Sequence, residues 1–171
     1  MTLKILGVDP GLAATGIGVV TGLYPKVHQF AYGVIRTYPK DPLPQRLEKI
    51  YSGLNKVLQE ERPDALIIED VFSLDQYPKS GITLGKVCGV IVLAGQQSLV
   101  QTTEIPVREA KMVLTGNGAA SKAQLEKAVR QALKSTQAIR PSHASDALGL
   151  ALIGLFRYGS TRQMDRQYQR P

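Results

Sequence analysis

The first part of the chain alternates short apolar runs with turn residues, a pattern typical of β-strands. Residues 3–8 are apolar and end at the turn signal Asp9-Pro10-Gly11. Two further β-rich runs follow at 17–20 and 27–36, separated by glycine and proline. Because the connecting segments are short, we expect these three strands to be antiparallel neighbours in a meander.

The spacing of apolar residues then changes to three and four, which predicts an amphipathic helix of about 15 residues that ends before Pro63. Residues 65–68 form a continuous apolar run that ends at Glu69, as a buried parallel strand would. We expect a second helix over 80–98 and a short fifth strand over 104–107.

Two helices are predicted in the last third of the chain. Ser121-Lys122-Ala123-Gln124 has the sequence of a capping box, and Pro141-Ser142 begins the final helix. From Gly159 the chain is polar and rich in Gln and Arg, so we expect one folded domain at 1–158 and a disordered basic tail at 159–171. The order βββαβαβαα indicates an α/β fold around a mixed sheet.

Composition fits one soluble domain of 171 residues, with 43% apolar and 20% charged residues. The single cysteine, Cys88, excludes an internal disulfide and suits a reducing cytosol. The start resembles no secretory signal, and no apolar run reaches the roughly 18 residues of a membrane span. We therefore expect a cytoplasmic protein that does not enter a membrane.

The net charge indicates which kind of partner the protein binds. The chain carries a formal charge of +7 and has a pI of about 9.6. Such an excess favours a polyanion, because basic side chains release the counterions that nucleic acids condense.

Four side chains are candidates for chemistry. Asp9 and Glu69 end the first and fourth predicted strands, and functional groups of α/β sheets gather at the carboxyl ends of strands. His143 and Asp146 lie three residues apart in the first part of the last helix, on one face. Three carboxylates and an imidazole at one point would repel or titrate unless divalent cations such as Mg²⁺ or Mn²⁺ neutralised them. Two such ions about 4 Å apart can promote in-line displacement at a phosphodiester.

The motifs that carry these residues resemble those of the RuvC crossover junction endodeoxyribonucleases, over about residues 3 to 156. They are Gly7-Val8-Asp9-Pro10-Gly11-Leu12 with Thr15-Gly16, Ile68-Glu69-Asp70-Val71-Phe72, Leu84-Gly85-Lys86, and His143-Ala144-Ser145-Asp146-Ala147-Leu148. The resemblance implies a ribonuclease-H-like fold with a five-stranded mixed sheet flanked by helices. It also implies a homodimer that resolves Holliday junctions in DNA recombination and repair by paired symmetric nicks, with Mg²⁺ or Mn²⁺, two per active site, and with the RuvAB branch-migration complex as a partner.

Residue by residue, Asp9, Glu69 and Asp146 match metal-binding carboxylates of that family. His143 stands where the commonest family pattern has a fourth aspartate. Imidazole is a competent ligand that suits Mn²⁺ better than Mg²⁺, so ligation is the favoured role. The alternative is that His143 works as a general base or acid.

A further set of residues is expected to contact DNA. The segment after the fourth strand mixes aromatic and basic residues, and its first aromatic residue matches the family position thought to stack at the crossover. Two lysines further along match family positions that approach phosphates. The expected DNA-binding residues are Phe72, Tyr77, Lys79, Lys86, Lys111 and Lys122.

Three other functions are compatible with parts of this pattern. Another ribonuclease-H-like enzyme acting on RNA or on RNA–DNA hybrids could have the same acidic site. The Asp-Pro-Gly-x-x-x-Thr-Gly motif also resembles a phosphate loop of actin-like ATPases, but no second such motif is found. A junction-binding protein with a decayed site is the non-enzymatic alternative, and only His143 supports it.

Overall fold

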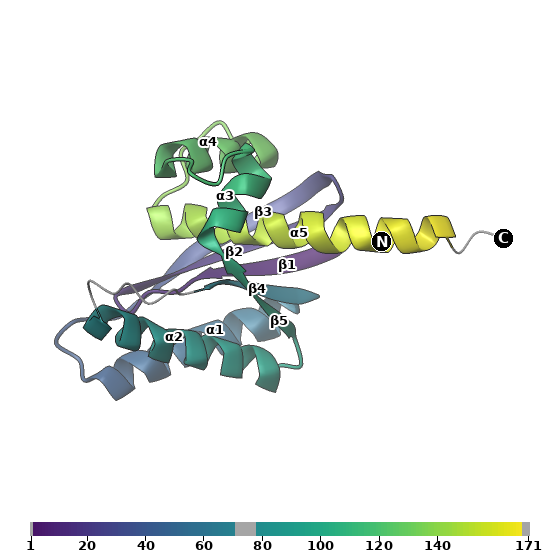
Figure 1. Ribbon diagram of the computed structural model, residues 1–171. Helices are drawn as coiled ribbons and strands as arrows, with labels where there is room; N and C mark the ends of the chain where they lie inside the picture. The colour runs from purple at the N-terminus through teal and green to yellow at the C-terminus, as the bar shows by residue number, and fades with distance from the viewer. Residues whose placement is uncertain (1, 71–77, 169–171) are drawn as a thin grey trace.

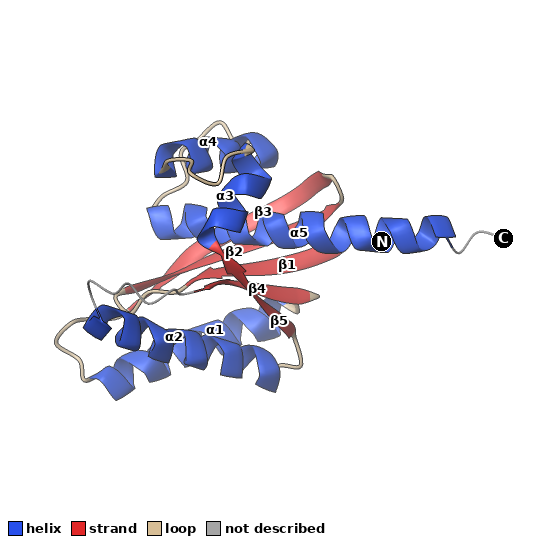
Figure 2. Cartoon of the chain, in the orientation of Figure 1, coloured by secondary structure: helices blue, strands red, loops and turns tan. Residues whose placement is uncertain are grey.

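A computed structural model describes residues 2–70 and 78–168 of this protein, as a five-stranded sheet between two layers of helices (Figures 1 and 2). The strands are β1 Leu3–Asp9, β2 Ala14–Leu23, β3 Lys26–Arg36, β4 Ala65–Asp70 and β5 Gln101–Pro106. The helices are α1 Leu43–Glu61, α2 Pro78–Gln97, α3 Val107–Thr115, α4 Lys122–Leu133 and α5 Ser142–Tyr168.

The strand order in the sheet is β3-β2-β1-β4-β5. Strands β1, β2 and β3 form the predicted antiparallel meander. Strand β4 pairs in parallel with β1 and with β5, so the expected mixed sheet is confirmed. The parallel register places Val8 opposite Ile68, which brings the residues that follow them, Asp9 and Glu69, to the same edge.

Successive side chains of a strand point to opposite faces, and here each face has its own core. Leu6 and Val8 pack with α1 and α2, whereas Ile5 packs with α3, α4 and α5. Figure 2 shows these two helical layers below and above the sheet. By the same alternation Asp9 and Glu69 lie on the face that α5 covers, because each is two residues beyond a residue of that face.

Helix α5 lies unusually close to β1 and β2, and three glycines make this possible. A Cβ on Gly18 would lie 2.5 Å from a backbone nitrogen of α5, and one on Gly16 would lie 2.5 Å from the carbonyl carbon of His143. A Cβ on Gly7 would be 2.6 Å from the backbone nitrogen of Ala151. No side chain fits at these positions, so the start of α5 is held directly against the strand that carries Asp9.

The helical pattern was predicted largely correctly, with one omission. The capping box is present, since Ser121 accepts from the backbone of Gln124 and the Gln124 side chain accepts from the backbone of Ser121. The predicted order lacks α3, because the sequence predicts a strand over 104–107 and no helix between it and the capping box at Ser121. Strand β5 ends at Pro106, which has no backbone N–H for the ladder, and α3 begins at the next residue.

Helix α5 is longer than the sequence predicted. It continues to Tyr168, whereas regular structure was expected to stop near Gly159. Gly159 packs so closely on Tyr24 that a Cβ there would overlap the Tyr24 side chain, which anchors the helix beyond the core. Once a helix is anchored, each further residue adds a backbone hydrogen bond at little cost. The division into a domain at 1–158 and a tail at 159–171 stays a prediction.

Within the described ranges, no helix is both long and apolar enough to cross a bilayer.

Candidate active site

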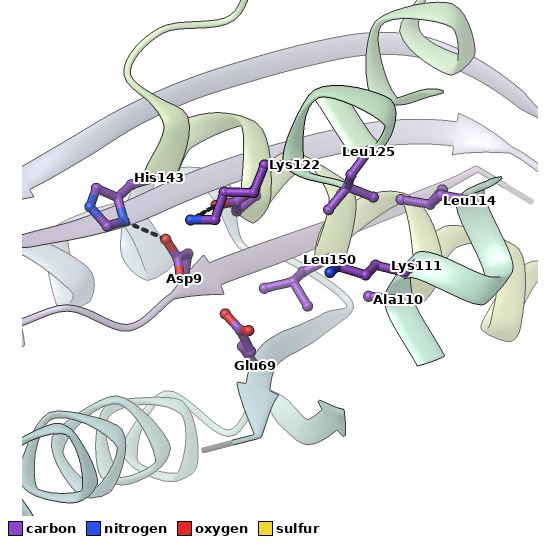
Figure 3. A pocket seen from close by; sticks show the side chains of 11 residues that line it. Asp9, Glu69, Ala110, Lys111, Leu114, Lys122, Leu125, His143 and Leu150 are labelled. Atoms are coloured by element: carbon purple, nitrogen blue, oxygen red, sulfur yellow. Dashed lines mark hydrogen bonds and ion pairs between the residues drawn. The ribbon is translucent and has the colours of Figure 1, made fainter. Parts of the chain in front are cut away.

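Asp9 and Glu69 meet where β1 and β4 end. Asp9 is 7% exposed and Glu69 is half-buried, and both point from the sheet toward the start of α5 (Figure 3). Backbone pairing of the two parallel strands fixes their separation, so this acidic pair is a direct result of the strand register.

Helix α5 adds two groups from its first turns. His143 and Asp9 form a hydrogen bond of 2.6 Å between Nδ1 and Oδ2, drawn as a dashed line in Figure 3. Asp146, one turn further along α5, lies 4.0 Å from Lys122 Nζ through its Oδ2. The close approach of α5 at Gly16 places the His143 backbone beside the end of β1, which makes the 2.6 Å contact possible.

The four predicted residues line one pocket of about 160 Å³, so the structure brings them together as the sequence predicted. Its walls also include two lysines, Lys111 of α3 and Lys122 of α4. The rest of the lining is apolar: Ala110, Leu114, Leu125, Gly149 and Leu150. An acidic centre is therefore rimmed by two cations and backed by an apolar wall.

Burial and mutual repulsion raise the pKa values of two of the carboxyl groups. Burial, then the neighbouring Asp9 carboxylate, raises the pKa of Glu69 to about 8. Burial and Asp9 also raise the pKa of Asp146, an effect that the nearby Lys122 opposes. Burial and the neighbouring carboxylates therefore both disfavour the charged forms of Glu69 and Asp146.

The donor set fits divalent cations. Carboxylate oxygens with one imidazole suit Mg²⁺ or Mn²⁺, and an ion there would favour the charged form of Glu69, whose pKa burial and the Asp9 carboxylate raise. Among residues 2–70 and 78–168, no three His, Cys, Asp or Glu side chains already form a complete ligand geometry. Side-chain adjustment is therefore needed for the acids and His143 to surround an ion.

The loop after Asp9 is held by a network that the sequence did not reveal. Thr15 Oγ1 donates to Gly11 O at 2.8 Å, and the Thr37 hydroxyl donates to the carbonyl of Leu12. Arg46 Nε in turn donates to Thr37 Oγ1 at 2.8 Å. Since Thr15 and Thr37 are buried, this network fixes the backbone next to Asp9.

The predicted DNA-binding residues that the structure describes lie in different places relative to the pocket. Lys111 and Lys122 line the pocket, and Lys86 is exposed on α2 away from it. Lys79 lies in α2, but its side chain is outside what the structure describes. Phe72 and Tyr77 fall outside the described residues. The DNA contacts of all six stay predictions.

Sequence comparison shows which known proteins this chain is similar to. The family model for "Crossover junction endodeoxyribonuclease RuvC" matches residues 5–154. A RuvC of Photorhabdus laumondii is 38% identical, with 92% of this chain and 93% of that protein covered. A RuvC of Salinispora arenicola is 36% identical, with coverage of 95% and 93%.

Solved structures agree with the sequence comparison. The structure of Thermus thermophilus RuvC in complex with Holliday junction substrate superposes with a TM-score of 0.86 at 29% identity, covering 93% of this chain and 96% of that one. The ribonuclease-H-like fold predicted from the sequence is thereby confirmed. With the match over residues 5–154, these findings make this chain a member of the RuvC family of crossover junction endodeoxyribonucleases.

Proposed function

We propose that this protein resolves four-way DNA junctions in recombination and repair by placing paired symmetric nicks across the crossover. The observation that carries the proposal is the convergence of Asp9, Glu69, His143 and Asp146 on one pocket rimmed by Lys111 and Lys122. The acidic groups at the centre can bind metal ions, and the lysines at the rim can bind phosphates. Hydrolysis of a phosphodiester needs both kinds of group.

The acids and His143 would hold Mg²⁺ or Mn²⁺, two ions per site. Bound ions would activate water and stabilise the leaving 3′-oxygen. The chain's own contribution is to hold the acids together by the β1–β4 register and to orient Asp9 through the 2.6 Å contact with His143. Lys122, 83% exposed at its side chain, is free to turn from Asp146 toward a phosphate.

His143 can serve as a ligand or as a proton carrier. Its Nδ1 faces Asp9, so the other ring nitrogen, Nε2, is the atom left for a second partner. A ligand role is favoured because metal-bound imidazoles usually bond a carboxylate through the second nitrogen. A general base or acid is the alternative role.

We propose a homodimer that packs through α2. Ile82 and Leu93 are 63% and 51% exposed on this helix, and Gly85 and Gly89 between them have open space above the backbone. These positions recur at steps of three or four residues, so the two large apolar side chains and the two glycines lie along one stripe of the helix. Two active sites held at a fixed distance would explain symmetric nicks. Leu93→Glu should yield a monomer in sedimentation analysis that nicks junctions on one side only.

We propose that the protein acts in the cytoplasm together with the RuvAB branch-migration complex. A pull-down with purified RuvAB and junction DNA tests the partnership directly.

The decisive experiment compares a synthetic mobile junction, a linear duplex and an RNA–DNA hybrid with Mg²⁺, Mn²⁺ or a chelator. Symmetric nicks confined to the junction and dependent on the ion are expected. Cleavage of the hybrid in preference to the junction would contradict the proposal and favour the RNA-directed alternative. Asp9→Asn is the matched control, because it keeps the shape of Asp9 and should abolish cutting while sparing junction binding.

A further inference from the structure

A second cavity opens on the other side of Asp146. Its volume is about 500 Å³, and it lies between α4, the loop from α4 to α5, and the first turn of α5. Lys122 and Asp146 line both this cavity and the active-site pocket. A ligand in this second cavity would therefore be next to a group bound at the catalytic acids.

The charges around the second cavity leave one cation in excess. Arg130 Nε pairs with Glu126 Oε1 at 2.8 Å, and Lys122 lies 4.0 Å from Asp146. Arg140, exposed in the loop before α5, is the third cation that lines the cavity. A phosphodiester carries one negative charge, so it would balance this excess.

A buried hydroxyl in the wall has no partner. Ser145 is 2% exposed and lines the cavity, yet its Oγ makes no hydrogen bond. Leaving a buried polar atom without a hydrogen-bond partner typically costs about 1–3 kcal/mol of stability. The missing partner of Ser145 Oγ can therefore be an atom of a bound ligand.

The helix end beside this hydroxyl also favours an anion. Residues 142–145 form the first turn of α5 and include no acidic side chain. The N-terminus of a long helix carries a partial positive charge that attracts phosphate groups. Arg140, the hydroxyl of Ser145 and this helix end thus converge on one cavity.

We propose that this second cavity binds a phosphodiester of the cleaved strand that neighbours the scissile one. Arg140 supplies the charge and Ser145 Oγ donates a hydrogen bond to a phosphate oxygen. This inference rests on the proposed junction cleavage, since it concerns how the same strand is positioned. It extends the substrate contacts past the acidic pocket to a face of α4 and α5 that no predicted DNA-binding residue except Lys122 reaches.

The test uses synthetic junctions in which one phosphate at a time, at symmetric positions of the cleaved strands, is replaced by an uncharged methylphosphonate. Binding is measured by fluorescence anisotropy with chelator present, so that no strand is cut. The wild type should bind about two- to tenfold more weakly when one particular phosphate next to the cleavage position is neutralised. Arg140→Gln and Ser145→Ala should each lose that sensitivity at the same phosphate.

Salt dependence gives a second readout. Arg140→Gln should lower the slope of log affinity against log salt by about 0.9, the value for one lost phosphate contact. Lys127→Gln, which removes an exposed lysine of α4 that lines neither cavity, should retain both the slope and the methylphosphonate pattern. Cooperative melting at or above the wild-type temperature establishes that the variants fold.

The outcomes separate the two proposals. A wild type that neither binds nor cuts unmodified junctions overturns the proposed function. A wild type that cuts junctions, combined with an Arg140 or Ser145 variant that keeps full sensitivity at every phosphate, overturns the second site alone.

Discussion

The close approach of α5 to the sheet can be tested with a single methyl group. Gly16→Ala would place a Cβ 2.5 Å from the carbonyl carbon of His143, whereas ordinary contacts need 3.4–4 Å. The obstacle is backbone, so the start of α5 must move by about 1 Å. Gly16 has no left-handed φ, so the effect comes from this contact and not from backbone strain.

The displacement would reach the active site directly. A shift of about 1 Å would lengthen the 2.6 Å contact between His143 Nδ1 and Asp9 Oδ2 to about 3.6 Å, too long for a hydrogen bond. Misplacement of a catalytic group by about 1 Å can cost about 100-fold in rate. The free energy of unfolding should fall by about 1–3 kcal/mol, as for other overpacked sites.

The assay is single-turnover cleavage of a junction, with affinity and thermal unfolding measured on the same variants. Gly16→Ala should cut about 100-fold more slowly while binding junctions nearly as well. Gly33→Ala is the matched control, since it lies on the neighbouring strand, opposite Ile17, and a Cβ there meets nothing within 4 Å. If Gly16→Ala cuts at the wild-type rate, the close packing of α5 against Gly16 does not position His143 and the reasoning is wrong.

Three further predictions concern pH, charge and metal. If His143 is a metal ligand, protons should compete with Mn²⁺ for its imidazole, so cleavage should decline at acidic pH and His143→Asp should lose this decline. Identical pH profiles would argue against ligation. The folded protein keeps a proton on Glu69 up to about pH 8, whereas an unfolded chain releases it near 4.5, so the metal-free protein should lose thermal stability as pH rises between these values. Saturating Mn²⁺ should reduce that loss, and a melting temperature independent of pH in both conditions would contradict the electrostatic account of the site. Lys111→Ala and Lys122→Ala should each weaken the salt dependence of junction binding, and an unchanged slope would exclude a phosphate contact.

The acidic pair could be predicted because it depends on local rules. An apolar run followed by an acid marks the end of a buried strand, and the period of two then decides which face the acid occupies. Asp9 and Glu69 satisfy both rules, and the parallel register completes the pair. His143 and Asp146 were found from helical spacing and from the family motif.

Other parts of the site depend on tertiary contacts that leave no local pattern. The position of Lys111 in a nine-residue helix was missed because Pro106 and the residues around it are compatible with the end of a strand. Thr37 and Arg46 support the loop after Asp9 from other parts of the chain, and no spacing in the sequence links them to it. The second cavity was likewise not predicted, because a lone serine within a helical motif gives no sign that its hydroxyl lacks a partner.

The pairing of the last helix with the first strand has a consequence during synthesis. Asp9 is made early, but its partner His143 follows 134 residues later in the chain. A nascent polypeptide that still lacks α5 therefore has half of its acidic centre and no helix to complete it. A ribosome-bound fragment would be unable to cut DNA, so the nuclease becomes active only when the fold around it is finished.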